Sequence, residues 1–325
     1  MSQHALTLEL SHFASLGEFA EAGLRSTTLA LERAQRSFGE GRIPIAGAAV
    51  SMDAGGQLTT VTVGNNGRIP PPGTDSIGYP TDHGETAAIR ELADVGAWDW
   101  SRVVFTTTLS PCIMCNRTLS YLYTLGLNKI VIAEAQTYPG TKDLLKKLPG
   151  MTLVELTNPD GVRMMRAFSR TYPWDWAADI GEVPPQDLAF ARGLSHNAEV
   201  QKQLISDVVK EHLRGNSDYS AGVVSPKGKL ITSVGDQRSD HGGNPTYSAA
   251  MIAIGEAGSS VNLRECVLVF AAGDTRTLAG VAEFGHSSLG ACELFRPAAV
   301  LSNVAFDDAL KEALGKVHVE VIETR

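Results

Sequence analysis

Two cysteines in the stretch SPCIMC, Cys112 and Cys115, stand three residues apart, just after an apolar run and a proline. If a helix begins there, both sulfur atoms lie on one face, because residues three apart are neighbours on a helix surface. The amino end of a helix favours negative charge, so the thiolates that metals bind form more readily there. This geometry suits a zinc site and a redox dithiol equally well, and the pair alone does not decide between them.

A second short motif, TDHGE, supplies His83 and Glu85. A closed structural zinc site needs four protein ligands, usually two CxxC pairs. The sequence has no second pair, and Cys266 and Cys292 are isolated. His83 and the two cysteines of SPCIMC make three ligands and leave one tetrahedral position open, which is typical of a catalytic zinc ion. Glu85 is then a carboxylate close to the metal that is not needed as a ligand.

The combined pattern H-x-E…P-C-x-x-C resembles the signature of zinc-dependent nucleobase deaminases. The chemistry that it predicts is hydrolytic. Zinc lowers the pKa of its bound water, so that hydroxide is present at neutral pH. Glu85 accepts the proton of that water and delivers it to a ring nitrogen of the substrate. Hydroxide then attacks the ring carbon that bears the amine, and ammonia leaves. One zinc ion and no organic cofactor are expected.

The elements that must position these motifs alternate along the chain. The first 25 residues are expected to form a loosely ordered arm with at most one short helix. A helix follows that Ser26 or Thr27 caps and that Gly39 and Gly41 close. We then expect, in order, strands over 43–53 and 57–65, a Pro- and Gly-rich loop over 67–82, a helix over 83–95, a strand over 102–109, a helix over 112–126, and strands over 129–135 and 151–156. This alternation predicts a sheet covered by helices, an α/β layer fold.

A second unit begins near Pro184 and Pro185 and repeats the order of the first. The stretch IAGAAVSMDAGGQLTTVTVGN corresponds to SAGVVSPKGKLITSVGD, and ETAAIREL corresponds to YSAAMIAI. This weak similarity predicts a tandem duplication of one α/β domain. Two unrelated α/β domains are the alternative, because strand–turn–strand–helix is a common pattern.

The second unit is expected to lack a zinc site. Its motif SDHGGNP looks like TDHGE, but aligning the helices places Pro245 at the position of His83 and Tyr247 at that of Glu85. The residue two after His241 is a glycine, and no CxxC follows. We therefore expect one zinc ion per chain and a structural role for this unit, either as a packing partner or as a cover for the pocket.

The chain resembles the cytidine deaminase-like superfamily, and residues 26–182 look most like fungal-type cytosine deaminase. The matching pieces are GRIPIAGAAV, HGE, TTLSPCIMC and WDWAADIGE. The resemblance implies a three-layer α/β/α fold, here duplicated. It implies a zinc-dependent deaminase domain over residues 1–184 and a degenerate deaminase-like domain over residues 185–325. Its implied activity is deamination of cytosine or a related free base.

The resemblance also implies six substrate-binding residues, namely Asn66, Gly84, Ser110, Tyr138, Trp176 and Asp179. The Asn66 amide would bind the ring carbonyl and a ring nitrogen, and the backbone of Gly84 would contact the base. The Ser110 carbonyl and the Asp179 carboxylate would accept hydrogen bonds from the amino group that is lost, since both are acceptors. The two aromatic rings would pack against the substrate as part of a lid.

Each of these residues also has a plainer interpretation. Asn66 precedes Gly67, and Asn-Gly is a strong turn signal, so a structural role for this asparagine is the alternative. Ordinary packing is the alternative for Trp176, and a solvated helix acid for Asp179. The loop over 67–82 is several residues longer than the resemblance implies, so another small amino-substituted N-heterocycle stays open as the substrate.

Composition and charge argue against several other classes. A net charge of −8 disfavours a nucleic-acid surface, where Lys and Arg must replace condensed counterions. No apolar run approaches the roughly 20 residues that span a bilayer. The start, MSQHALTLELSHF, lacks the basic and long apolar regions of a secretory signal. We therefore expect a cytoplasmic protein whose partners are a small N-heterocycle and water, with no nucleic acid and no membrane. Whether it forms a homodimer is left open.

Three alternative functions remain at this point. One is a deaminase of a nucleoside or RNA, or of another amino-heterocycle such as a purine, triazine or pterin. Another is a thiol oxidoreductase that uses Cys112 and Cys115. The third is a non-enzymatic binding protein that kept the fold.

Overall fold

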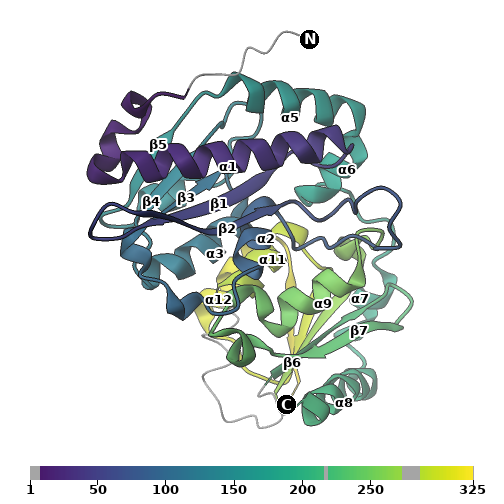
Figure 1. The fold of residues 1–325 in the computed structure, drawn as a ribbon. Helices are drawn as coiled ribbons and strands as arrows, with labels where there is room; N and C mark the ends of the chain where they lie inside the picture. Colours follow the sequence, from purple (N-terminus) through teal and green to yellow (C-terminus); the bar gives the residue numbers. More distant parts are fainter. Residues whose placement is uncertain (1–7, 216–218, 273–285, 325) are drawn as a thin grey trace. The chain divides into compact units, whose positions relative to one another are not determined.

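The computed structural model of the chain describes residues 8–215, 219–272 and 286–324 (Figure 1). The chain divides into two compact units. The first consists of Met1–Ser76 and Asp82–Trp176, and the second of Ile77–Thr81 and Ala177–Arg325. The chain therefore passes between the units three times, because a five-residue piece within the first half belongs to the second unit. No helix in the described ranges is long and apolar enough to cross a membrane.

The first unit is built on a five-stranded sheet in the order β2-β1-β3-β4-β5. Its strands are β1 (Ala46–Met52), β2 (Leu58–Asn65), β3 (Val103–Thr107), β4 (Lys129–Ile132) and β5 (Thr152–Glu155). β1 pairs antiparallel with both β2 and β3, whereas β3, β4 and β5 are parallel. Each strand expected for this unit is present, with shorter limits. The carboxyl end of β3 delivers the chain to Cys112.

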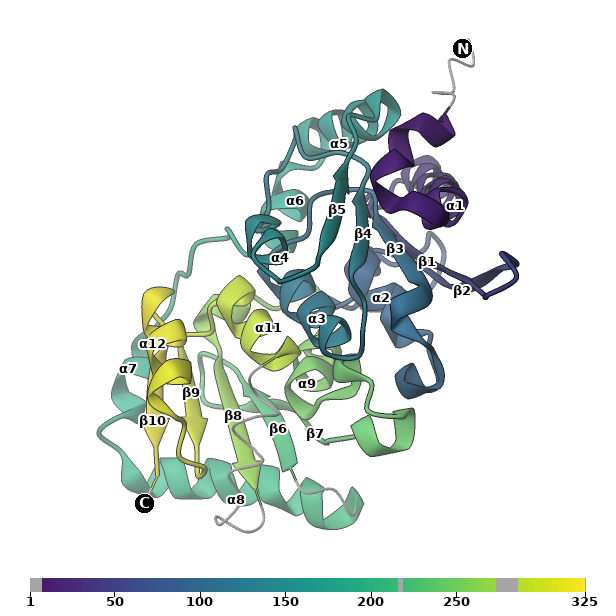
Figure 2. The same ribbon diagram turned by 90° about the vertical axis from the view of Figure 1, so that its left-hand side faces the viewer.

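Helices cover both faces of this sheet (Figures 1 and 2). On one face lie α1 (Ala20–Gly39) and α5 (Pro159–Thr171), and on the other α2 (Gly84–Arg90) and α3 (Ile113–Thr124). The shorter elements are η1 (Leu10–Phe19), η2 (Val95–Ala97), η3 (Trp100–Arg102), α4 (Asp143–Lys146) and α6 (Pro173–Asp179). Fully buried side chains between the sheet and the α2–α3 layer include Trp100, Phe105, Leu119, Leu122 and Ile130. This is the predicted three-layer α/β/α arrangement.

The amino-terminal region differs from the expectation. Leu10–Phe19 form η1, and three of its side chains are buried in the core with β-strand residues, namely Phe13, Leu16 and Phe19. α1 begins at Ala20, so the prediction that Ser26 or Thr27 caps it is wrong. Both residues are buried inside α1, and Ser26 Oγ shares a 2.6 Å hydrogen bond with Thr106 Oγ1 of β3. Their hydroxyls join the helix to the sheet instead of ending it. The first seven residues of the expected arm lie outside the described ranges.

The second unit contains another five-stranded sheet, in the order β10-β9-β8-β6-β7. Its strands are β6 (Tyr219–Val224), β7 (Leu230–Gly235), β8 (Val267–Ala272), β9 (Ala299–Ser302) and β10 (Glu320–Glu323). α8 (Ala198–Gly215) covers one face, and α9 (Ala249–Ala257) and α11 (Ser287–Phe295) cover the other (Figures 1 and 2). The remaining elements are α7 (Ala189–Leu194), η4 (Arg238–His241), η5 (Pro245–Tyr247), η6 (Leu263–Glu265) and α12 (Asp308–Lys316).

The two sheets share one topology. β6 pairs antiparallel with β7 and β8, and β8, β9 and β10 are parallel, as in the first sheet. Even the irregularity in the hairpin recurs, between Ala49 and Val50 in β1 and between Val223 and Val224 in β6. A duplication of one domain would produce this correspondence. The predicted boundary at residue 184 and the degenerate character of the second domain stay predictions.

Candidate active site

His83 is the residue that precedes the first turn of α2, in extended conformation. Its N–H donates a hydrogen bond to Thr86 Oγ1 (2.9 Å), and its carbonyl accepts one from the Ala87 N–H (2.8 Å). Immediately before it, the Asp82 carboxylate pairs with Arg90 Nε at 2.7 Å. These contacts fix the backbone on both sides of His83. The imidazole is therefore presented from a turn that is already ordered by the protein.

α2 packs directly on the backbone of β1 and β2. A Cβ atom added at Gly64 would lie 2.2 Å from the Ala88 nitrogen, and one at Gly47 would lie 2.7 Å from the Gly84 carbonyl oxygen. Real Cβ atoms essentially never approach that closely, so only glycine permits this packing without a backbone shift. Glu85 follows Gly84 in the same turn. The close packing therefore sets the depth at which the Glu85 side chain is held.

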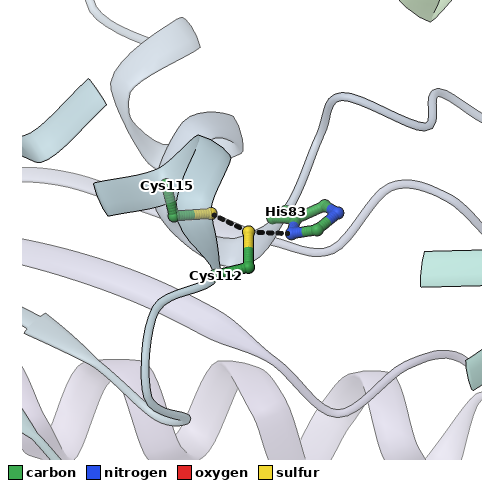
Figure 3. A group of neighbouring side chains, drawn as sticks. All are labelled: His83, Cys112 and Cys115. Atoms are coloured by element: carbon green, nitrogen blue, oxygen red, sulfur yellow. Dashed lines mark hydrogen bonds between the residues drawn. The ribbon is translucent and has the colours of Figure 1, made fainter. Parts of the chain in front are cut away.

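Cys112 precedes α3, and Cys115 lies in its first turn. Cys112 Sγ is 3.3 Å from His83 Nδ1 and 3.5 Å from Cys115 Sγ (Figure 3). The ligand atoms of these three buried residues all lie within 4.8 Å of one another. Around a tetrahedral zinc ion, Zn–S and Zn–N bonds near 2.3 and 2.0 Å separate neighbouring ligand atoms by about 3.5–3.8 Å. The donor set and its spacing therefore fit one Zn²⁺ ion.

The two thiols have opposite electrostatic environments. Burial, together with the neighbouring Cys112, raises the pKa of Cys115 well above its ordinary value. Burial acts in the same direction on Cys112, but the hydrogen bond from Cys115 and the positive charge of His83 outweigh it and lower the pKa of Cys112 well below its ordinary value. One thiolate is thus readily formed. Ionising the second requires a further positive charge close by, which a metal ion supplies.

Glu85 lies beside the ligands and is buried, with 2% of its surface exposed. Its Oε1 accepts a hydrogen bond from Thr107 Oγ1 at 2.8 Å. Burial, and then the negative charge of Cys112, raise the pKa of Glu85 to about 7. A carboxyl group with a pKa near neutrality can both accept and return a proton, as general acid–base catalysis requires. Sequence reasoning missed Thr107, because a threonine at the end of a strand gives no signal of a contact with a helix.

Ser110, Tyr138 and Trp176, three of the predicted substrate-binding residues, are brought together. Ser110 Oγ donates a hydrogen bond to the Pro139 carbonyl at 2.6 Å. Gly140 has a left-handed φ of 56°, and a Cβ there would lie 2.7 Å from Ser110 Oγ. The Tyr138 ring packs edge-on against the Trp176 ring, with centroids 5.5 Å apart and planes at 90°. An aromatic pair thus stands beside the turn that precedes Cys112.

Asn66 is fully buried and has a structural contact. Its Oδ1 accepts a hydrogen bond from the Arg68 N–H at 2.9 Å, the pattern of an Asx turn. The Gly67 N–H donates to the Asp82 carbonyl at 2.6 Å. This bond places the residue after Asn66 against the residue before His83. The structural interpretation of Asn66 is therefore present in the fold, and its contact with a substrate stays a prediction.

Gly84 and Asp179 complete the predicted set. A Cβ at Gly84 would lie 2.7 Å from the backbone of Ala46, so packing alone requires glycine there. Asp179 ends α6 and is 1% exposed. It belongs to the second compact unit, whereas Trp176, three residues earlier in the same helix, belongs to the first. The substrate contacts of Gly84 and Asp179 stay predictions.

At the starts of α9 and α11, the second unit places serines. Ser248 precedes α9, and its Oγ shares a 3.0 Å hydrogen bond with Ser288 Oγ in the first turn of α11. Ser248 precedes α9 just as His83 precedes α2, so the structure places Ser248 at the position that corresponds to His83. The comparison of the two sequences had placed Pro245 at that position. His241 stacks on the Tyr247 ring, with centroids 3.5 Å apart. The described residues of this unit contain no group of three close metal-binding side chains.

The first unit matches known proteins. A family described as "Cytidine and deoxycytidylate deaminase zinc-binding region" matches residues 23–134, which include the three candidate ligands and Glu85. A cytosine deaminase of Candida albicans is 31% identical over 154 residues, covering 47% of this chain and 93% of that protein. This chain belongs to the cytidine and cytosine deaminase family. As a member of this family it is a hydrolytic deaminase, and His83, Cys112 and Cys115 fit the family's single zinc ion.

Some solved structures resemble parts of this deaminase. One comes from work described as biochemical and structural studies of A-to-I editing by tRNA:A34 deaminases, with 19% identity, a TM-score of 0.28, and coverage of 41% of this chain and 98% of that one. Another is a mutant of the protein NE0047 in complex with 8-azaguanine, with 16% identity, a TM-score of 0.33, and coverage of 53% of this chain and 99% of that one. Scores this low support no conclusion about the substrate of this deaminase.

The burial of the two cysteines argues against the alternative function of a thiol oxidoreductase. Cys112 and Cys115 are only 4% and 1% exposed. Redox cysteines that exchange with a partner need partial exposure. Thiol–disulfide exchange also does not require a histidine and a buried carboxyl group, and the fold places both beside the sulfur atoms, as His83 and Glu85.

Proposed function

We propose that this deaminase releases ammonia from cytosine or a closely related free amino-substituted N-heterocycle. The observation that supports this most strongly is the buried group formed by His83, Cys112 and Cys115 with Glu85 beside it. This group lies within residues 23–134, which match the zinc-binding region of the family, and the chain aligns with 93% of the length of a cytosine deaminase. The arrangement supplies a metal site and one nearby proton-transferring group, which are the parts that hydrolytic deamination needs.

The residues around the site have separate tasks. A zinc ion bound by such ligands lowers the pKa of water and so supplies a hydrolytic nucleophile at neutral pH. Glu85 takes up one water proton and passes it to a ring nitrogen of the substrate. It then takes up the second proton of the same water, as the ring carbonyl forms, and transfers it to the departing amine, which leaves as ammonia. Its buried position keeps bulk water from competing for the proton. No organic cofactor is required, because the substrate and water together supply all the atoms of the two products, ammonia and a ring that carries a carbonyl group.

Thr107 has one hydroxyl hydrogen and two neighbouring acceptors. Its Oγ1 lies 2.8 Å from Glu85 Oε1 and 2.8 Å from the Leu109 carbonyl. When Glu85 is ionised, Thr107 donates to the carboxylate. When Glu85 is protonated, the carboxyl group can donate to Thr107 Oγ1, and Thr107 can donate to Leu109. Both protonation states of Glu85 are therefore hydrogen-bonded in the same place, which favours repeated proton transfer without a side-chain movement.

The proposed substrate contacts follow the same logic. The Ser110 carbonyl and the Asp179 carboxylate accept hydrogen bonds from the amino group, and Asn66 binds the opposite edge of the ring. The edge-on pair of Tyr138 and Trp176 supplies aromatic surface for a flat heterocycle. An acidic chain with a net charge of −8 suits a small neutral base better than a nucleic acid. The second unit is proposed to bind no zinc, with Ser248 and Ser288 at the corresponding helix starts.

Ammonia release over a panel of candidate substrates tests this proposal. The panel holds cytosine, cytidine, deoxycytidine, adenine, guanine, an aminotriazine and a pterin, each assayed with zinc-loaded protein. We expect kcat/KM for a free base, with cytosine first, to exceed that for each nucleoside by at least about 100-fold, because a pocket fitted to a base has no room for the sugar. A nucleoside turned over faster than every free base would contradict the proposal.

A further inference from the structure

The five residues Ile77–Thr81 lie in the middle of the first half of the sequence but belong to the second compact unit. They form part of the loop over 67–82, which links β2 to α2 and is longer than the family resemblance implies. The loop leaves the first unit after Ser76 and returns at Asp82, next to the metal ligand His83. The second unit therefore holds a piece of chain that continues directly into the metal site.

The central contact of this piece is made by Tyr79. Its ring lies over Gly255 of α9, where an added Cβ would stand only 2.0 Å from the ring atom Cε1. The Tyr79 hydroxyl donates a hydrogen bond to the Ile252 carbonyl, one helical turn earlier, at 3.3 Å. At position 255, only glycine leaves room for the Tyr79 ring on the surface of α9. The helix is thus shaped to receive the tyrosine.

Further contacts hold both ends of the piece. Thr81 is fully buried, and its Oγ1 donates a hydrogen bond to the Met251 carbonyl at 3.2 Å. The Ile77 carbonyl accepts one from the Ser259 N–H at 3.2 Å. The piece is therefore bound along its whole length by α9 and the residues that follow it.

The base of the same loop is fixed in the first unit. The Gly67 N–H donates to the Asp82 carbonyl at 2.6 Å, and Asp82 pairs with Arg90 at 2.7 Å. The loop thus starts beside Asn66 and ends beside His83, and its middle is held by α9. His83 has additional support from the Arg90 pair and the first turn of α2. A change at the middle of the loop should therefore shift the loop itself and leave the metal ligand in place.

We infer that the second unit is a positioning module for the substrate pocket, which acts by holding Tyr79 and Thr81 against α9 and so fixes the loop between Asn66 and His83. Tyr79 is a positioning residue in this account, and Gly255 is the feature of α9 that admits it. The inference rests on the proposed function for its effect on substrate binding. It gives the extra domain a part in catalysis although that domain is proposed to bind no zinc.

Gly255→Ala is the sharpest test, because alanine favours a helix more than glycine does and the substitution therefore does not weaken α9 itself. The added methyl group displaces the Tyr79 ring. Tyr79→Ala removes the ring, so the double variant Gly255→Ala/Tyr79→Ala should behave as Tyr79→Ala does. The matched control is Gly315→Ala in α12, a helix glycine of the same unit with open space around the added Cβ.

Three readouts are compared in the full-length zinc-loaded protein. In Gly255→Ala we expect amide hydrogen exchange over 77–81 to be at least about tenfold faster, KM to rise about tenfold with kcat within about twofold, and bound zinc to stay at the wild-type level. A displacement of about 1 Å in a catalytic site can lower the reaction rate by up to 10²-fold, so a tenfold change in KM is a modest effect.

The exchange measurement needs no substrate and so separates the two proposals. If Gly255→Ala and Gly315→Ala show the same exchange over 77–81, the positioning inference is overturned whatever the substrate is. Equal KM values for these variants, in an enzyme that deaminates cytosine, overturn it as well. Faster exchange in Gly255→Ala, in a protein that releases no ammonia from any panel compound, supports the mechanical link and overturns the proposed function alone.

Discussion

Replacing Thr107 by valine tests whether the hydroxyl group that contacts Glu85 contributes to catalysis. Valine has nearly the same shape as threonine and keeps the β-branched form that suits β3. The change removes the hydrogen bond to Glu85 Oε1 and the one to the Leu109 carbonyl, both 2.8 Å long. Glu85 keeps its place in α2, because that place is set by the packing of α2 on Gly47 and Gly64.

The size of the effect follows from the charge of the partner. A hydrogen bond to a charged group contributes about 1.5–3 kcal/mol, and a factor of ten in rate corresponds to about 1.4 kcal/mol. If the full free energy of this hydrogen bond stabilises the transition state, kcat of Thr107→Val should be about 10- to 100-fold lower than that of the wild-type protein. KM should change little, since Thr107 is not expected to touch the substrate.

The same strand provides a matched control. Thr106 is the preceding residue, is equally buried, and bonds to Ser26 on the other face of the sheet. Thr106→Val therefore removes a buried threonine hydrogen bond from β3 without touching Glu85. Thr107→Ser keeps a hydroxyl group and should restore most of the activity.

Steady-state ammonia release and thermal unfolding are measured for all three variants with zinc bound. We expect Thr107→Val and Thr106→Val to lose similar amounts of stability, but only Thr107→Val to lose kcat. If the two valine variants have the same kcat, or if Thr107→Ser is as slow as Thr107→Val, the reasoning about Thr107 and Glu85 is refuted.

Three further predictions concern packing and metal. Gly64→Ala should destabilise the first unit by about 1–3 kcal/mol, because its Cβ would lie 2.2 Å from the Ala88 nitrogen, whereas Gly39→Ala, with open space around it, should not; urea unfolding compares them. Phe13→Ala should cost about 3–5 kcal/mol in the same assay, since Phe13 is fully buried, and a cost below about 1 kcal/mol would mean that η1 is not part of the core. Free zinc at about 1,000 times its dissociation constant should stabilise the wild-type protein by about 4 kcal/mol over the chelated form. Cys112→Ser should lose most of that gain in differential scanning calorimetry, and an equal gain in both proteins would contradict the ligand assignment.

The three metal ligands could be predicted from the sequence because each is positioned by the few residues around it. Two short motifs each begin a helix, and the first turn of a helix fixes where its side chains point. His83, Cys112 and Cys115 therefore needed only one further condition, that the two helix starts meet at the sheet. The alternation of strands and helices predicts that condition, and the fold meets it.

Contacts between distant segments gave no such signal. Thr107 and Glu85 come from a strand and a helix, and nothing in either segment announces the other. The burial of η1 was missed because Phe13, Leu16 and Phe19 do not follow a clean α-helical period, and Ser26 and Thr27 look like capping residues. Ser26 and Thr27 are instead used inside α1, because Ser26 finds a hydroxyl partner on β3.

The loop over 67–82 shows the same limit from another side. Its composition indicates a loop, and the Asn-Gly pair indicates a turn. The structure adds that Tyr79 fits against Gly255, which lies 176 positions later in the chain. A glycine inside a helix is readable as a weak point of that helix, but the side chain that it admits cannot be read from the sequence.

The most direct test of the central claim combines zinc content with ammonia release for the wild-type protein and Glu85→Gln. Glutamine keeps the size of the side chain and can still hydrogen-bond Thr107, but it cannot take up a proton. We predict one zinc ion per chain in both proteins and a fall in kcat of about 10²- to 10⁴-fold in the variant, the range typical of a lost acid–base group. A zinc-loaded Glu85→Gln protein that turns over at the wild-type rate, or a second zinc ion per chain, would contradict the account.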